Sequence, residues 1–284
     1  MRRRPAPRHH RTAATRQKAH VRARSASRMG PLVTRFKCTL EYDGTPYAGW
    51  QWQEGQPSAQ GALERAIRDF CQEDLRVQCA GRTDAGVHAI GQVVHFDLTK
   101  DRTAYQVMEG VNFHLLERNE SVRVLSCEAV DDEFHARFHA TSRRYLYHII
   151  NRRAPLALQA NRAWQIGHAL DLAAMRKGAA LLIGHHDFSS FRAAECQAES
   201  PVKTLDKLQI EQDGQDIRIH LQARSFLHNQ VRIMVGSLVK VGSGKWQLMT
   251  FSACCKPKTA PRQAQPPRLT GCIWQRSIMR NNFV

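Results

Sequence analysis

The stretch CAGRTDAGVHAIGQVVHFD, residues 79–97, places an Arg, an Asp and a His between three glycines. Gly, Thr and Asp are ordinary turn residues, so the motif GRTDAGVHA (81–89) predicts a tight turn, and the extended sequence on both sides places it between two strands. The turn holds a short carboxylate, Asp84, next but one to Arg82, and a nearby guanidinium favours an ionised carboxylate. From these residues alone Asp84 is a nucleophile, a general base, a metal ligand or only the acceptor of a turn hydrogen bond. The turn interpretation is the simplest.

Strand-like and helix-like segments alternate along the rest of the chain, and a similar order occurs twice. The segment 171–184 predicts a helix with Asp171 as N-cap and Gly184 at its end. The predicted helices are 58–73 with Ser58 as N-cap, 104–118, 171–184 and 226–242. The predicted strands include 33–43, 75–81, 94–98, 121–130, 141–150 and two joined by a hairpin at Asp213-Gly214. We expect an α+β fold of two halves with a mainly antiparallel sheet, residues 33–140 and 141–246.

The predicted helix at 226–242 has an amphipathic pattern. Its apolar side chains form one stripe, and the opposite face carries His228, Asn229, Arg232 and Gly236. A glycine beside these polar groups suits close approach of another molecule.

The composition is that of a globular protein, with 284 residues and 42% hydrophobic content. No apolar run approaches the roughly 18 residues of a membrane span, so we expect a soluble, cytoplasmic protein without a membrane partner. The eight cysteines are scattered, without CxxC or a Cys/His zinc spacing. Free thiols and no structural metal are expected.

The net charge of +17 is concentrated at the two ends of the chain. Residues 1–28 carry ten Lys or Arg and residues 256–284 carry six, both without an acid. Because the body is nearly neutral, bulk charge is weak support for a nucleic-acid partner. We expect residues 1–32 to be a disordered basic extension: an RNA-binding arm, a transit peptide or, as we favour, sequence upstream of a true start at Met29.

The motif GRTDAGVHAIGQVVHFD (81–97) closely resembles the active-site motif of the TruA-type tRNA pseudouridine synthases. Four further stretches resemble other blocks of that family in the same order: LEYDGTPYAGWQWQ (40–53), FHARFHATSRRYLYHI (134–149), GHHDFSSFRAAECQ (184–197) and ARSFLHNQVRIMVGSLVKVGSGKW (223–246). The resemblance implies isomerisation of uridine to pseudouridine in tRNA, at positions 38 to 40 of the anticodon stem-loop, without metal or small-molecule cofactor. It also implies a duplicated ferredoxin-like or RRM-like fold with a central RNA-binding cleft, in a protein that usually forms a homodimer.

The same resemblance assigns roles to particular residues. Asp84 becomes the catalytic carboxylate, either a nucleophile or an electrostatic partner of the extruded base. Tyr145 matches the active-site tyrosine, which can stack on uracil or transfer the proton at C5, whereas Tyr147 is expected in the core. Arg232 matches a helical arginine of the family and is expected to pair with Asp84. The expected substrate and RNA contacts are Arg82, Arg137, Arg143, Arg144, Arg192 and His228.

The chain departs from the family after Trp246. Family members continue with a helix, a segment like AKDRxxAGPTAP and a closing strand like GLYLxxV, whereas residues 247–284 are basic and lack clear periodicity. When residues 257–276 are written as codons and read one base earlier, permitted codon choices give AKDRAKAGPTAPADGLYLAA. We therefore infer that the tail is the product of a frameshift near residues 247–250, a real lesion or a sequencing error. A real lesion would remove a sheet strand and its supporting helix.

Two alternatives to an active synthase stay open at this point. One is a non-catalytic RNA-binding remnant that keeps the pocket but is inactivated by the altered C-terminus. The other is a hydrolase with Asp84 as nucleophile and His88 as base, which leaves Tyr145 and Arg232 without roles.

Overall fold

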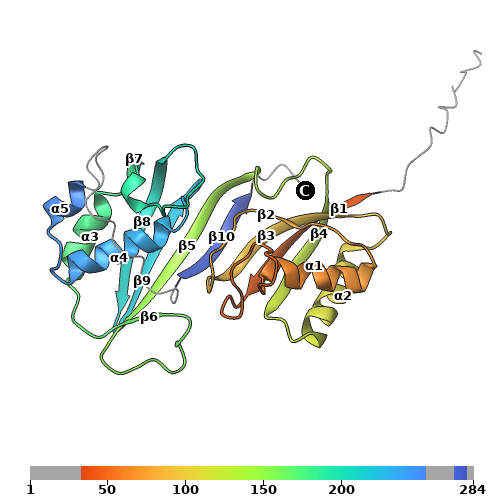
Figure 1. The fold of residues 1–284 in the computed structure, drawn as a ribbon, viewed down its shortest axis with the longest axis horizontal. Coiled ribbons are helices and arrows are strands. Elements are labelled where there is room, and N and C mark those ends of the chain that lie inside the picture. The colour runs from red at the N-terminus through yellow and green to blue at the C-terminus, as the bar shows by residue number, and fades with distance from the viewer. Residues whose placement is uncertain (1–32, 254–271, 280–284) are drawn as a thin grey trace, which may run out of the picture. The chain divides into compact units, whose positions relative to one another are not determined.

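The computed structural model describes residues 33–253 and 272–279. Their strands form one ten-stranded sheet in the order β4-β1-β3-β10-β5-β9-β8-β7, with β2 beside β3 and β6 beside β5 (Figure 1). Among the described strands, β10 runs parallel to β3 and β6 runs parallel to β5, and the other pairs are antiparallel. Helices combined with a mainly antiparallel sheet confirm the predicted α+β fold class.

The first half of the sheet carries two helices. In chain order its elements are β1 (Thr34–Tyr42), α1 (Ala59–Cys71), β2 (Gln78–Cys79), β3 (His88–Leu98), α2 (Ala104–Glu117) and β4 (Val122–Val130). Ser58 caps α1 as predicted, because its Oγ accepts a hydrogen bond from the Gly61 N–H at 3.1 Å. The 81–89 motif connects β2 to β3, so the predicted turn between two strands is confirmed.

The second half has the same mixture of elements. They are β5 (Ala140–Asn151), β6 (Trp164–Ile166), α3 (Leu172–Ala180), β7 (Gly184–Asp187), the 3-10 turn η1 (Ser189–Phe191), β8 (Val202–Asp213), β9 (Asp216–Ala223), α4 (Gln230–Gly242) and α5 (Leu248–Ala253). Asp171 caps α3 as predicted, since its Oδ1 accepts from the Ala174 N–H at 2.9 Å. The prediction that Gly184 ends this helix is wrong. Gly184 has φ +112° and begins β7, because the chain leaves the helix after Ala180.

Helix α4 is buried on nearly all sides and is not the amphipathic helix that the sequence pattern indicates. Arg232 is 5% exposed and Ser237 is 1% exposed, although both lie off the apolar stripe. The cause is that α4 contacts α3, η1 and α5 and that Arg232, on the other face, contacts the Asp84 motif. Arg232 is therefore a buried arginine, and its donors must be satisfied inside the protein or by a ligand.

Strand β10 (Cys272–Met279) occupies the centre of the sheet. It pairs in parallel with β3 and antiparallel with β5, so it joins the two halves (Figure 1). From the sequence, we expect a real lesion to remove the closing strand. That expectation is wrong for the backbone of residues 272–279, which form β10, and the helix α5 precedes this strand in the chain. A position between two strands offers backbone hydrogen bonds on both edges, and these bonds do not depend on side-chain identity. The frameshift itself stays a prediction.

The hydrophobic core continues through both halves. Helices α1 and α2 pack together beside β4, and α3 packs against α4 and β8 (Figure 1). Trp50 and Tyr147 are among the largest fully buried side chains, which confirms the expected core position of Tyr147. Within the described part of the chain, each helix is too short or too polar to span a bilayer.

Candidate active site

Two loops meet at the motif, and a glycine allows their close approach. Gly49 forms an isolated bridge with Asp84, and the Trp50 N–H donates to the Thr83 carbonyl at 2.9 Å. Gly49 has φ +124°, and a Cβ atom at this position would lie 2.8 Å from the Thr83 carbonyl oxygen. Both the conformation and the contact require glycine. The loop before α1 therefore fixes one side of the motif.

Buried groups hold the motif from within. The Thr83 and Tyr42 hydroxyl oxygens lie 2.7 Å apart, and burial raises the pKa of Tyr42, which keeps this phenol protonated. Gly86 adopts φ +71° and donates its N–H to the Tyr47 carbonyl at 3.3 Å. The backbone at Asp84 is consequently fixed on both sides, while 34% of its side chain is exposed.

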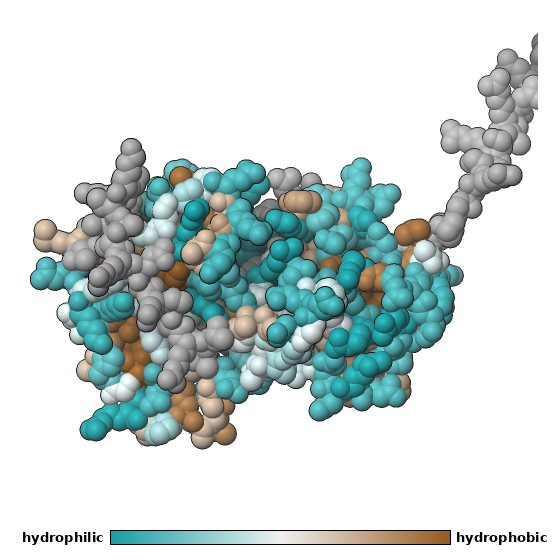
Figure 2. All heavy atoms as spheres, in the orientation of Figure 1, coloured by the Kyte–Doolittle hydropathy of each residue, from teal (hydrophilic) through white to brown (hydrophobic). Residues whose placement is uncertain are grey.

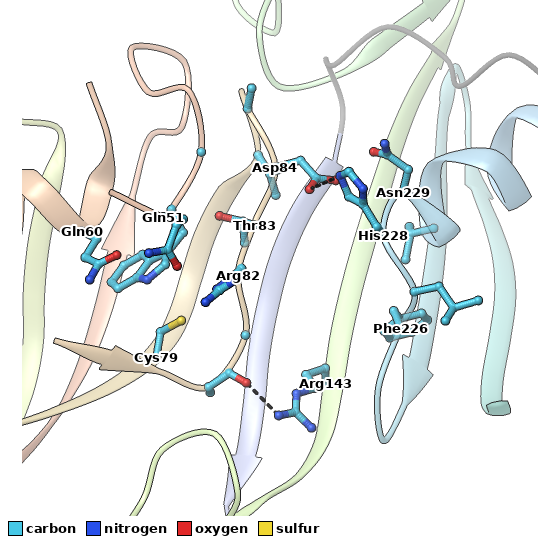
Figure 3. A pocket seen from close by; sticks show the side chains of 18 of the residues that line it. Gln51, Gln60, Cys79, Arg82, Thr83, Asp84, Arg143, Phe226, His228 and Asn229 are labelled. Carbon is cyan, nitrogen blue, oxygen red and sulfur yellow. Dashed lines mark hydrogen bonds and ion pairs between the residues drawn. The ribbon is translucent and has the colours of Figure 1, made fainter. Parts of the chain in front are cut away.

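The Asp84 side chain lies in a cleft of about 940 Å³ that is lined by both halves of the sheet (Figure 3). This volume is in the upper part of the range of ligand sites, about 300 to 1,000 Å³. The lining includes Arg82, Arg137, Arg143, Tyr145, Phe226, His228 and Arg232. Hydrophilic side chains predominate on the face of the molecule that Figure 2 shows. The predicted central cleft is thus present and contains most of the predicted site residues.

Asp84 faces a histidine from the opposite wall of the cleft. His228 Nε2 lies 3.4 Å from Asp84 Oδ1, and the two side chains point toward one another in Figure 3. His228 is in the loop before α4, where Asn229 has φ +59°. The structure therefore gives His228 a direct contact with the candidate catalytic carboxylate, in addition to the RNA contact that the sequence predicts.

Arg232 lies beside the motif but does not form the expected ion pair with Asp84. Its Nη2 donates to the Ala85 carbonyl at 3.0 Å, one residue beyond the carboxylate. Its Nε is buried without a hydrogen-bond partner among the described residues. A buried guanidinium with an unused donor has capacity for an anion, which can be the Asp84 carboxylate after a side-chain rotation or a group of the substrate.

Tyr145 lies on β5 at the wall of the same cleft. Its ring packs edge-to-face on Phe226, with ring centroids 5.1 Å apart and an interplanar angle of 88°. This contact fixes the ring orientation, as expected for a stacking platform. Tyr147, two residues along the strand, points into the core instead and contacts Trp164 at 6.2 Å between ring centroids.

The predicted RNA-binding arginines divide into three groups. Arg82 and Arg137 are exposed side chains that line the cleft. Arg143 also lines it, but its guanidinium donates to backbone carbonyls, including Ala80 at 2.7 Å and Arg137 at 3.0 Å. Arg144 donates to Gln222 at 3.0 Å, and neither Arg144 nor Arg192 is among the lining residues.

His88 is occupied by structural contacts, which argues against a hydrolase. Its Nδ1 accepts the Gly44 N–H at 3.2 Å and lies 3.1 Å from Asp43 Oδ1. Its Nε2 lies 2.8 Å from the Asn161 carbonyl, and the residue is 6% exposed. A general base needs a free nitrogen near its substrate, and both ring nitrogens of His88 have partners away from Asp84.

Comparison with known proteins shows the family. A family model described as tRNA pseudouridine synthase matches residues 39–139 and 179–270. The tRNA pseudouridine synthase A of Brucella anthropi is 52% identical over 237 residues, which cover 83% of this chain and 94% of that protein. The protein of the same name from Brucella ovis is 51% identical over the same shares. A chain of a Cbf5-Nop10-Gar1 complex is similar with a TM-score of 0.34 and 8% identity, over 73% of this chain and 45% of that one.

The family match and the two relatives place the chain among the RNA-modifying isomerases of the pseudouridine synthase class. The chain belongs to the tRNA pseudouridine synthase family.

Three features of the site were not predicted from the sequence. They are the contact of His228 with Asp84, the Thr83–Tyr42 hydroxyl pair and the support of Tyr145 by Phe226. Each joins residues far apart in the chain, so local pattern carries no signal for it. The closest available signal was the polar group His228-Asn229 directly before a helix.

Proposed function

We propose that this chain isomerises uridine to pseudouridine in the anticodon stem-loop of tRNA, at positions 38 to 40, with Asp84 as the catalytic carboxylate. The observation that supports this proposal best is the placement of Asp84: a fixed backbone presents its carboxylate in a 940 Å³ cleft, 3.4 Å from a histidine. Tyr145 and Arg232, which the family resemblance singles out, line the same cleft. Family membership supplies the reaction, and the cleft supplies a site for it.

The reaction requires a carboxylate and an enclosed base. The bond between C1′ and N1 breaks, the uracil rotates, and a bond between C1′ and C5 forms. C5 then loses its proton and N1 gains one, so the reaction needs neither an oxidant nor a co-substrate. Asp84 acts as nucleophile or as electrostatic partner of the detached base. Tyr145 stacks on the uracil, and its hydroxyl is our candidate for proton transfer at C5.

The cations around Asp84 have separate tasks in this proposal. His228 faces the carboxylate, 3.4 Å away, and orients it in the cleft. Arg82 and Arg137 are exposed on the lining and contact phosphates of the extruded nucleotide. Arg232 holds the motif through the Ala85 carbonyl and keeps Nε for an anion.

Tritium release from tRNA that contains 5-tritiated uridine tests the chemistry. We expect release by the full chain and a loss of at least ~1,000-fold in the Asp84→Asn variant, as is usual for a residue that acts on the reacting atoms. Glu195→Gln is the matched control, since Glu195 is another carboxylate of the lining but lies on an exposed loop. Release that survives Asp84→Asn removes Asp84 as the catalytic residue. Binding of tRNA without release by the wild-type chain supports the non-catalytic remnant.

The position of the target is tested separately. Replacing the uridines at positions 38 to 40 by cytidine in the tRNA abolishes release if these are the substrates. Release that continues refutes the position but leaves the chemistry intact. We further propose a homodimer in the cytoplasm, where tRNA is modified. Light scattering on the purified chain tests the first of these statements, and a monomeric mass at micromolar concentration refutes it.

A further inference from the structure

A second cavity lies beside the cleft, at the far end of β2 from the motif. Its volume is about 520 Å³, and its lining is Trp52, Gly61, Glu64, Arg65, Arg68, Asp74, Leu75 and Arg76. Arg76 also lines the cleft of Asp84, so the two cavities share a wall. Neither the candidate mechanism nor the predicted RNA contacts use any of these residues.

The centre of this second cavity is an exposed tryptophan under an arginine. Trp52 is 42% exposed, which is unusual for the largest apolar side chain. The Arg76 guanidinium carbon lies 4.8 Å from the centroid of its ring, a cation–π contact. Arg76 itself has 59% of its side chain exposed. An aromatic surface and a cation thus face solvent together.

A buried hydrogen-bond network holds this pair in place. Gln60, 5% exposed, accepts the Trp52 N–H on its Oε1 at 3.0 Å and donates from Nε2 to Glu64 at 2.8 Å. Glu64 in turn accepts from Arg76 at 2.9 Å and from the Val77 N–H at 2.9 Å. The backbone of Trp52 and the side chain of Arg76 are therefore held by two connected side chains of α1, Gln60 and Glu64, and such fixed positions preorganise a binding site.

Gly61 shows that the tryptophan lies close against α1. A Cβ atom on Gly61 would lie 3.1 Å from Trp52 Cδ1, tighter than ordinary contact. Arg65 and Arg68 extend from the same helix along the cavity wall, with 39% and 49% of their side chains exposed. Each of the three arginines of the lining is also in an ion pair, Arg65 with Glu120, Arg68 with Asp74 and Arg76 with Glu64.

From these observations we propose that Trp52 and Arg76 form a stacking platform for an unpaired nucleotide of the tRNA, outside the nucleotide that is isomerised. This inference rests on the proposed function. A base stacked on an aromatic ring must expose its face, so a loop nucleotide fits and a paired one does not. The six-residue step from Arg76 to Arg82 spans at most ~20 Å. A nucleotide on the platform and a uridine at Asp84 can therefore belong to one stem-loop.

A double-mutant cycle that combines protein variants with modified RNAs tests the platform. The RNA is an anticodon stem-loop hairpin in which each loop nucleotide in turn is abasic, and affinity is measured by filter binding with the full chain. We expect Trp52→Ala to weaken binding roughly 5- to 150-fold, the range for loss of one stacked base, and Trp52→Phe to retain most of the affinity. One abasic position should weaken wild-type binding by a similar factor and have no further effect on Trp52→Ala.

Two variants control for indirect effects. Tyr105→Ala removes an aromatic ring that is 70% exposed on α2, and Arg118→Ala removes an arginine that is paired with Asp69 and lines neither cavity. Neither should change affinity. Arg76→Ala should weaken binding and lower the salt slope, whereas Trp52→Ala should leave that slope unchanged.

Several outcomes overturn the platform. They are unchanged affinity in Trp52→Ala, equal weakening in Tyr105→Ala, or additive losses at every abasic position. The failure of the proposed function is distinguishable, because the wild-type chain would then release no tritium from tRNA. A wild-type chain that releases tritium, together with an unaffected Trp52→Ala variant, refutes the platform alone.

Discussion

Replacing Arg143 tests whether its guanidinium holds three backbone segments together around the cleft. Its guanidinium donates to the carbonyls of Ala80, Arg137 and Arg224, which belong to three separate segments around the cleft. Burial lowers the pKa of Arg143, and its carbonyl partners satisfy the donors that burial would otherwise leave unpaired. Arg143 therefore positions the segment that leads into the motif.

The magnitude follows from these bonds. A hydrogen bond from a charged donor contributes about 1.5 to 3 kcal/mol, and bonds that share one side chain are not additive. We expect Arg143→Met to lower the free energy of unfolding by ~3 kcal/mol, or roughly 6 to 12 °C in Tm. Arg143→Lys should recover little of this loss, because an ammonium group lacks the planar fork that reaches three carbonyls. Turnover should fall in both variants while the salt dependence of tRNA binding stays unchanged.

Calorimetry and filter binding at several salt concentrations separate the two roles. A phosphate contact predicts the opposite pattern: Arg143→Lys close to wild type, Tm unchanged in both variants, and a salt slope that is smaller by about one in Arg143→Met. That pattern would refute a role of Arg143 in holding these segments together. Arg82→Met is the matched control, since Arg82 is exposed on the same cleft and should change the salt slope without changing Tm.

Three further outcomes are expected. Burial, with a smaller contribution from nearby His135, lowers the pKa of His95 to about 4, so the unfolded chain binds this proton at a higher pH than the folded chain does. The free energy of unfolding should therefore fall by on the order of 1 to 2 kcal/mol as the pH drops from about 6.5 to 4. A calorimetric stability that stays constant over this pH range contradicts the prediction. Cys38 and Cys127 face each other across β1 and β4 with Sγ atoms 3.1 Å apart, so oxidised dithiothreitol should couple them, and mass spectrometry should find that disulfide and no other among the described cysteines. Gly49→Ala should lower both Tm and turnover, because an added Cβ meets the motif backbone at 2.8 Å in a φ that alanine avoids; a wild-type Tm contradicts this.

The sequence was informative where structure depends on neighbours in the chain. Ser58 and Asp171 cap their helices because each needs only the backbone three residues ahead. The motif turn and the hairpin at Asp213-Gly214 are local in the same sense. These elements could be placed from residue type and spacing alone.

Prediction failed where the outcome depends on distant segments. Gly184 has the residue type of a helix end, but pairing with β8 draws its segment into the sheet. Arg232 was expected to bind Asp84, yet the packing around α4 directs it to the adjacent carbonyl. The role of Arg143 depends on the register that places it opposite Ala223 on β9, one residue before the Arg224 carbonyl that it binds. No periodicity in one strand contains that information.

The tail affects the active site through the sheet. In β10, Trp274 is opposite Ala89, the last residue of the 81–89 motif, on β3, and also opposite Tyr145 on β5. The backbone of one tail residue therefore connects the two strands beside the candidate catalytic groups. Pairing with both neighbours fixes the backbone of β10 at this position.

If a frameshift produced the tail, the sequence in the shifted reading frame should stabilise the central strand of the sheet better than the present sequence does. A chain in which residues 257–276 read AKDRAKAGPTAPADGLYLAA should therefore have a higher Tm and a higher rate of tritium release than the present chain. Stability and rate should rise together, because the same strand holds both walls. A tail of the same composition in scrambled order is the control and should give neither gain. A restored chain that is less stable or less active than the present one would show that the existing tail is the sequence that the sheet requires.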